Sequence, residues 1–479
     1  MRILPLLCLL LLQEQDPGEK LLAKMMQLMD EGRYVEGRVL AQQILRKHSK
    51  TSIGQRAAPY AEENAFLRIV PIEVTGPSGN RIDIAIMPEG LEYENQAQAR
   101  WEKEGDAILR SLFTSEVFRA YAPCFNLYRI HVGSKESRLN KSDGPVLTFF
   151  TAREEQGEIL VDGFRSRDTA ALSGTKDRLA MVQVRPAGNT HGASGHGVAV
   201  VGSPRPSPQQ VMHAWGHSLA GLSDEMGGSR DWGGMQRSER KDPPPVPNAP
   251  NVSTTKDPTA VPWAHWLAAK KAGDRRAAKI DVIEGAARHQ TKAWRAVDET
   301  QCVMNSGSDF CPICREAIVL MFYTYIRPID DATPSGRTMT AEAGASVDLF
   351  VLPIRPATHR LKVQWVIERT PPAGAKGDDA TGRISEEGTV SGPLRCGNGL
   401  PGMRNGEGPA WRMPVGDAVE GTPVGKPGQS EREVLTLSSA KFGTGPIRVT
   451  AVVRDLTEWV LKDTQNLLVD WRTWIVELK

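Results

Sequence analysis

Two histidines and two carboxylates stand close together in the stretch HAWGHSLAGLSDEM, residues 213–226. His213 and His217 are four residues apart, which places both imidazoles on one face of a helix, one turn apart. Two such imidazoles can hold a zinc ion, and an acidic residue after a turn at Gly221 can add a third ligand. The chemistry would be the activation of a metal-bound water for hydrolysis.

The position of the general base carries no base. In zinc-protease helices a glutamate follows the first histidine and accepts a proton from the metal-bound water. Here that position is Ala214, and Glu225 is the nearest acid that could replace it. General-base catalysis contributes typically about 10²–10⁴-fold to a rate, so the sequence predicts that hydrolysis is impaired. Taken alone, the histidine spacing also fits two histidines that only serve packing.

Further residues of this stretch carry a family resemblance. The stretch resembles the IgA peptidase family of zinc metallopeptidases, whose helix reads H-E-x-G-H-S-x-A-G-L-x-D-E-Y. It matches at His213, Gly216, His217, Ser218, Ala220, Gly221, Leu222, Asp224 and Glu225. Similar segments follow the family's order from IDIAIMPEGLEYEN through CFNLYRIHVGSKES, HGASGHGVAVV, PNVSTTKDPTAVPWAHW and IEGAA to CVMNSGSDFCPICREAI, so the resemblance covers about residues 80–330.

The resemblance implies a metzincin-like site for one zinc ion. It makes His213 and His217 ligands, favours Asp224 as the third, and places Met304 beneath the metal. Loop histidines His191 and His196 are rivals to Asp224 that the family pattern does not require. Met226 replaces the family's tyrosine and has no hydroxyl to donate. With Ala214, this second departure predicts that the scaffold is kept while turnover is not.

The glycine-rich loop and the strand after it are candidates for substrate binding. An extended peptide or protein segment could add to the edge of the strand Val198–Val201. The residues expected to line it are Gly192, Gly195, Val198 and Ala199.

Cys302, Cys311 and Cys314 match cysteines of the family and are predicted to be structural. A disulfide between Cys302 and either Cys311 or Cys314 is favoured for an exported protein. A zinc knuckle would need a fourth ligand that the sequence does not identify. A redox role for CPIC would need a thioredoxin-like surrounding, which is missing.

The elements that position these residues indicate an α/β fold. Alternating strand and helix patterns predict a mixed-sheet, metzincin-like peptidase domain over residues 60–335. Before it, residues 17–50 predict a helical hairpin similar to a single tetratricopeptide unit, which needs a partner surface. After it, short strand patterns separated by turns predict an Ig-like β-sandwich over residues 338–479.

The net charge and the N-terminal sequence limit the classes of partner and the cellular locations that fit this chain. The net charge is +2 with no basic stripe, which excludes a nucleic-acid footprint. Residues 1–16 have Arg2 before an apolar run of ten, which is typical of a signal peptide, although a short buried helix is the alternative. We therefore expect a secreted or periplasmic protein with no membrane contact beyond export.

Three functions fit these observations. The first is an exported, catalytically impaired zinc metallopeptidase homologue that binds a protein or peptide in its cleft. The second is an active secreted zinc endopeptidase with a different base. The third is a structural or adhesive module carried by the C-terminal domain.

Overall fold

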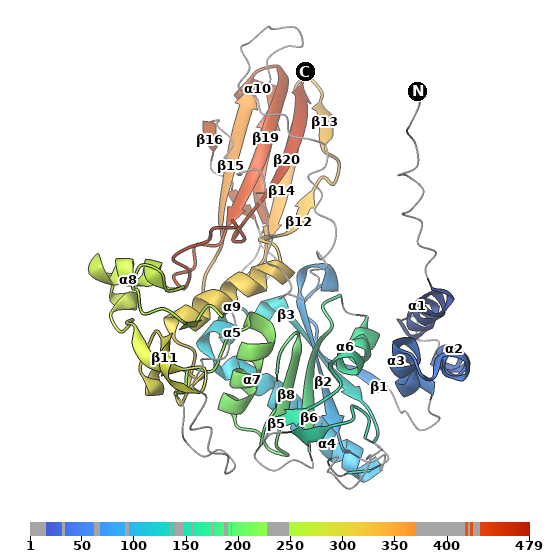
Figure 1. Ribbon diagram of the computed structural model, residues 1–479. Helices are drawn as coiled ribbons and strands as arrows, with labels where there is room; N and C mark the ends of the chain where they lie inside the picture. Colours follow the sequence, from blue (N-terminus) through green and yellow to red (C-terminus); the bar gives the residue numbers. More distant parts are fainter. Residues whose placement is uncertain are drawn as a thin grey trace, which may run out of the picture. The chain divides into compact units, whose positions relative to one another are not determined.

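The computed structural model describes most of the chain, and its contacts divide it into two compact units (Figure 1). The described residues are 16–30, 34–61, 68–91, 95–134, 136–137, 139, 148–155, 158–174, 176–185, 190–192, 194–227, 249–369, 417–419, 422–424 and 432–479. The first unit comprises residues 1–74, 83–112 and 126–218, and the second comprises 75–82, 113–125 and 219–479. Residues 1–15 of the predicted signal peptide 1–16 lie outside the described residues. None of the helices in the described part is long and apolar enough to cross a bilayer.

A six-stranded sheet is the centre of the first unit. Its order is β1-β3-β2-β6-β8-β7, with bounds β1 Arg68–Glu73, β2 Ile82–Glu89, β3 Phe125–His131, β6 Leu179–Val184, β7 Thr190–His191 and β8 Val198–Gly202. β2, β6 and β8 run parallel, whereas β1 and β7 run antiparallel to their neighbours. Every residue of β2, β6 and β8 is buried, as expected for strands covered on both faces. The predicted α/β fold with a mixed sheet is confirmed.

Helices pack on this sheet and beside it. Within the first unit these are α4 Asn95–Ser111, α6 Gly163–Ala170 and most of α7 Pro208–Ala220. A small hairpin of β4 Arg153–Glu155 and β5 Glu158–Leu160 accompanies them. The apolar core between the sheet and α6 includes Met87, Ala170, Val182 and Val200. This core is the platform on which β8, the strand next to the histidine helix, is held.

The N-terminal part contains three helices rather than two. They are α1 Pro17–Asp30, α2 Tyr34–His48 and α3 Ser52–Ala61. The sequence pattern predicted the first two but not α3, whose Ile53, Ala57 and Tyr60 share a core with Leu22 and Ile44. Leu172 joins the same core. The apolar face that two helices alone could not bury is therefore covered by a third helix and by Leu172, in the 3-10 turn after α6.

The second unit contains residues 75–82 and 113–125 together with the segments that follow the histidine helix. Its first part holds α5 Glu116–Ala120, β9 Val252–Ser253, α8 Ala264–Lys271, β10 Ile283–Ala286, β11 His289–Arg295 and α9 Pro312–Tyr325. β9, β10 and β11 form one small antiparallel sheet. The β10–β11 turn is tight, since Ala287 and Arg288 both adopt positive φ angles of 51° and 63°.

Two further sheets follow α9. One has the order β12-β14-β18-β17 and the other β13-β20-β19-β15-β16. The bounds are β12 Ile329–Thr333, β13 Thr338–Ala341, β14 Ser346–Pro353, β15 Lys362–Arg369, β16 Asp417–Val419, β17 Thr422–Val424, β18 Arg432–Ser438, β19 Gly445–Arg454 and β20 Val469–Leu478. Residues of both sheets share one apolar core, in which the rings of Trp365 and Trp474 stack with centroids 6.0 Å apart.

A buried polar cluster ties these sheets to the first part of the second unit. Asp455 Oδ2 accepts hydrogen bonds from Tyr121 (2.6 Å) and Tyr323 (2.5 Å), and its Oδ1 contacts His359 Nε2 at 2.8 Å. Burial would raise the pKa of Asp455, but these hydrogen bonds outweigh burial and lower it. The carboxylate is thus held charged and fully paired, as a buried charge requires.

Candidate metal centre

Helix α7, which carries His213 and His217, has capping residues at its N-terminus and a glycine turn after its C-terminus. Ser207 and Gln210 form a capping box, because Ser207 Oγ accepts from the Gln210 N–H (3.2 Å) and Gln210 Oε1 accepts from the Ser207 N–H (2.8 Å). Pro208 occupies the first helical position. After Ala220 the chain turns at Gly221, whose φ is +60°. The helix therefore starts within two turns of His213 and stops one turn after His217.

The two histidines converge on one face of α7. Their Nε2 atoms lie 3.0 Å apart, and their ring centroids lie 4.6 Å apart at an interplanar angle of 81°. Two imidazole nitrogens on one tetrahedral zinc ion stand about 3.3 Å apart when each bond is about 2.0 Å. Trp215 and Leu219, on the other side of the helix, are fully buried, whereas both histidines are half-buried. The pair therefore fits a zinc ion in position, spacing and access.

A hollow opens beside His213 within the first unit. It is lined by Gly192, Val200, Val201, Gly202, Ser203, Pro206, Gln210, His213 and Ala214. Ala214 is itself 4% exposed and contributes only a methyl group to this wall. The structure therefore places Ala214, at the position where the family resemblance predicts a general base, in the wall of the same hollow as His213.

Strand β8 is not the edge of the sheet, which corrects the prediction of a free edge at Val198–Val201. β7 pairs with β8 through Thr190 and His191. Gly195 exchanges two backbone hydrogen bonds with Val198, with N···O distances of 3.0 and 2.9 Å. Ser194 Oγ accepts from the Val200 N–H at 2.9 Å. The glycine-rich loop thus occupies the groups of β8 that a peptide was expected to use.

The glycines of this loop serve close packing. A Cβ at Gly192 would lie 2.3 Å from the Val200 carbonyl oxygen, so only glycine allows this approach. Gly195 has open space at the same position and is held by its pairing with Val198. Val198 and Ala199 are buried in the sheet. Of the four residues predicted to bind substrate, Gly192 alone lines the hollow beside His213.

Asp224 and Met226 belong to the second unit, so their place around a metal at the histidines stays a prediction. Asp224 Oδ2 accepts from Arg288 Nε at 2.6 Å, and the side chain is 10% exposed. Backbone bonds from the Ala287 and Arg288 N–H groups to the carbonyls of Asp224 and Met226 fix this loop on the β10–β11 turn. Carboxylates that bind a metal are in turn hydrogen-bonded to other side chains, so the contact with Arg288 is compatible with the predicted ligand role of Asp224.

The side chain of Glu225, in contrast, is buried in the protein interior, so Glu225 is not a substitute base. Its side chain is fully buried, and Oε1 accepts from Asn251 Nδ2 (3.0 Å) and the Cys314 thiol (3.1 Å). Burial, and then the neighbouring Cys311 charge, raise the pKa of Glu225 to about 8. A general base must come within hydrogen-bond distance of the proton that it abstracts. The carboxyl group of Glu225 is buried and hydrogen-bonded inside the protein, so it does not meet this requirement.

The three cysteines are free thiols, which corrects the expected disulfide. Cys302 Sγ lies 3.6 Å from Cys314 Sγ, and no bond joins Cys302 to Cys311 or Cys314. Met304 is fully buried in the same turn, where its carbonyl accepts from the Glu225 N–H at 2.8 Å. Its predicted place beneath the histidines lies across the two units and stays a prediction.

His191 and His196, the two loop histidines considered as alternative third ligands to Asp224, differ in what the structure describes of them. The side chain of His191 lies outside the described residues. His196 is exposed and adopts a positive φ of 50° in the turn before β8. The exposed side chain of His196 is typical of a loop residue and does not indicate a ligand role.

The family comparison agrees with this geometry. Residues 70–273 match the model of the IgA peptidase M64 family. No curated protein matches the chain. The matched segment contains the six-stranded sheet except the first two residues of β1, and it contains helix α7 with His213 and His217, and Asp224. Residues 70–273 of the chain therefore match the IgA peptidase M64 family.

Proposed function

We propose that this protein is a catalytically impaired zinc metallopeptidase homologue that is exported and binds a peptide or protein segment. The observation that supports it most strongly is the contrast between His213 and Ala214. The histidine pair keeps a ligand spacing of 3.0 Å, while the neighbouring wall of the hollow carries a methyl group. Metal binding is thus favoured while proton transfer is not.

His213, His217 and Asp224 are the residues that would hold the zinc ion. A bound zinc ion would supply Lewis acidity toward a peptide carbonyl or a water. The chain's own residues supply little more, since neither Ala214 nor Met226 can accept or donate a proton. Family membership and the convergence of the two rings support the zinc site; the third ligand rests on the family motif.

The hollow beside His213 is the place where a peptide would reach the histidines. Its lining includes Val200–Gly202, Ser203 and Gln210. Because the glycine-rich loop already pairs with β8, the peptide would enter this hollow rather than add to β8 as a further strand. The N-terminal helices and the predicted Ig-like sandwich, whose two sheets share one apolar core, would then serve attachment or positioning.

The test compares binding with cleavage. The purified protein is loaded with zinc, and a peptide library is analysed for retention on the immobilised protein and for cleavage by mass spectrometry. We expect retained peptides and at most very slow cleavage. Rapid, chelator-sensitive cleavage at ordinary protease rates would show instead an active endopeptidase with another base. Absence of both retention and cleavage would leave the adhesive module as the function.

A further inference from the structure

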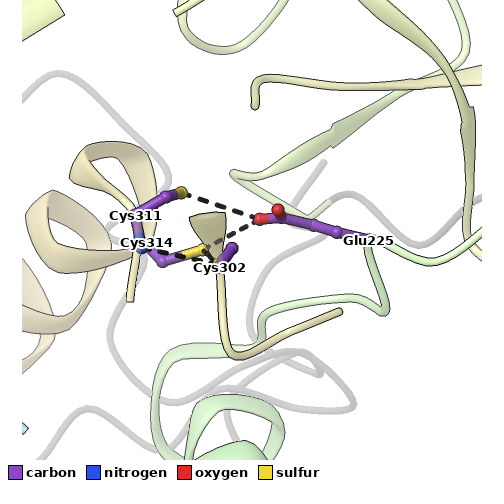
Figure 2. A group of neighbouring side chains, drawn as sticks. All are labelled: Glu225, Cys302, Cys311 and Cys314. Carbon is purple, nitrogen blue, oxygen red and sulfur yellow. Dashed lines mark hydrogen bonds between the residues drawn. The ribbon is translucent and has the colours of Figure 1, made fainter. Parts of the chain in front are cut away.

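A second group of metal-ligand side chains lies wholly inside the second unit. Figure 2 shows Glu225, Cys302, Cys311 and Cys314 pointing toward one another. They come from the loop after α7, the turn before α9, and the first turn of α9. One carboxylate oxygen and three sulfur atoms all lie within 4.8 Å of one another. This group is distinct from the histidine pair, which belongs to the first unit.

The distances fit four ligands of one tetrahedral ion. Zinc–sulfur bonds of about 2.3 Å and zinc–oxygen bonds of about 2.0 Å place two thiolates about 3.8 Å apart, and a thiolate and a carboxylate oxygen about 3.5 Å apart. Cys302 and Cys314 Sγ are 3.6 Å apart. Glu225 Oε1 lies 3.1 Å from Cys314 Sγ and 3.8 Å from Cys311 Sγ. Small shifts of these side chains would complete the tetrahedron.

The burial of Glu225 points to a bound cation. Glu225 is fully buried, and its Oε2 has no hydrogen-bond partner among the described residues. None of the ion pairs among those residues involves Glu225. A buried carboxylate with one oxygen unsatisfied is costly, because burial removes the water that would solvate it. A metal ion bound between the carboxylate and the thiolates would compensate that charge.

A disulfide explains the cluster less well than a metal. Three cysteines allow one bond and leave one thiol, and the glutamate would remain buried without compensation. A metal uses all four side chains. Four protein ligands leave no open position, which is typical of structural rather than catalytic zinc sites, and thiolates select zinc or iron over magnesium and calcium.

We propose that Cys302, Cys311, Cys314 and Glu225 form a structural site for one zinc-type ion. The ion would replace the thiol protons, which are released on binding. It would join the loop 223–226 to the start of α9. Asn305 already contacts this loop through a 3.1 Å hydrogen bond from its Nδ2 to the Glu225 carbonyl. The proposal does not depend on peptide binding or on zinc at the histidines.

The experiment removes the histidine site first. A full-length His213→Ala/His217→Ala protein, purified under reducing conditions, is analysed for metal by mass spectrometry. We expect one zinc or iron ion per chain, lost when Cys311→Ser is added. Cys124→Ser is the matched control, since Cys124 is also buried and free but stands outside the cluster; it should keep the ion. Cobalt loading should give a thiolate-to-cobalt charge-transfer band in the control and none in the Cys311→Ser protein.

A second measurement needs no cysteine variant. A mercurial reagent that blocks thiols should release one ion per chain from the His213→Ala/His217→Ala protein into a coloured chelator. Equal metal content in the Cys311→Ser and control proteins would overturn the proposal. So would a metal-free protein in which alkylation under denaturing, non-reducing conditions labels two thiols fewer than expected, because that result shows a disulfide.

Discussion

Asn251 donates a hydrogen bond to the same Glu225 oxygen that Cys314 contacts. Its Nδ2 donates to Glu225 Oε1 at 3.0 Å and to the Ser223 carbonyl at 2.8 Å, while its Oδ1 accepts from the Ser223 N–H at 2.9 Å. Asn251 is fully buried. It also begins the sequon Asn251-Val252-Ser253, but a side chain engaged at both of its polar atoms cannot accept a glycan in the folded protein.

We expect Asn251→Ala to destabilise the second unit by about 3 kcal/mol. The substitution removes one hydrogen bond from the buried Glu225 carboxylate, and it removes the partners that Asn251 supplies to the Ser223 N–H and carbonyl, at about 1–3 kcal/mol for each buried group left unsatisfied. Denaturant unfolding measures the change. The control is Gln209→Ala, which removes an exposed amide from α7 and should change the free energy of unfolding by less than about 0.5 kcal/mol. Equal effects of the two substitutions would contradict the role of Asn251.

Sequence patterns identified the histidine helix but not the cysteine cluster's fourth member. The spacing of His213 and His217 and the turn at Gly221 are local signals, and the structure has the two rings on one helix face and the turn at Gly221 as predicted. Glu225 is separated by a long stretch of chain from Cys302. Its contact with the cysteines depends on tertiary packing, which no local sequence pattern predicts. The family motif instead indicates the adjacent Asp224 as a metal ligand of the histidine site.

The misjudged edge of the sheet has a similar cause. β7 contains two residues, so its strand pattern is too short to recognise in the sequence. The loop that covers β8 is rich in glycine, which is also typical of a substrate-binding loop. A glycine-rich loop can therefore either cover a strand or bind a substrate. Only the structure shows the close approach of Gly192 to the Val200 carbonyl, which requires glycine and favours the first alternative.

The capping box of α7 gives a second prediction. Ser207→Ala removes the acceptor for the Gln210 N–H, and we expect the free energy of unfolding to fall by about 1 kcal/mol. Ser207→Asp keeps an acceptor at the N-cap and adds a charge that the helix dipole favours, so it should retain the original stability. Thermal unfolding of both variants measures the difference. If Ser207→Asp lost as much as Ser207→Ala, the cap would not be what stabilises this end.

Asp177 gives a pH dependence of stability. Burial raises the pKa of Asp177 to about 7, although the positive charge of Lys176 opposes the shift. In the unfolded chain the same carboxyl ionises near 3.8. Between these values the folded protein binds more protons than the unfolded chain, so this group makes the free energy of unfolding fall as the pH rises from about 4 to 7.

Asp177→Asn should remove that contribution. The asparagine oxygen can still accept the hydrogen bond from the Asp83 N–H that Asp177 Oδ2 accepts at 3.1 Å. We expect the variant to gain stability over the natural protein, on the order of a few kcal/mol between pH 4 and 7 at about 1.4 kcal/mol per pH unit. Urea unfolding at several pH values measures it. Asp281→Asn, at a side chain that is 67% exposed, is the control, and its curve should stay parallel to that of the natural protein.

Restoring the general base tests the proposed cause of catalytic impairment. Ala214→Glu would bring a carboxylate to the hollow that His213 also lines. The low end of a general-base contribution is about 10²-fold, and Met226 still lacks the donor hydroxyl. We therefore expect zinc-loaded Ala214→Glu to hydrolyse peptides at least tens of times faster than the natural protein. The matched control is Ala214→Gln, which has nearly the same size but cannot accept the proton.

Adding Met226→Tyr should raise the rate of Ala214→Glu again, and more than additively, because both groups would act on the same tetrahedral intermediate. Cleavage of a fluorogenic peptide, with and without a chelator, measures each step. Equal rates for Ala214→Glu and Ala214→Gln at full zinc occupancy would show that the lost base is not what limits hydrolysis. A zinc-loaded double variant that stays inert would show that the peptide is not presented to the metal in a reactive position, and binding would then be the activity that the hollow retains.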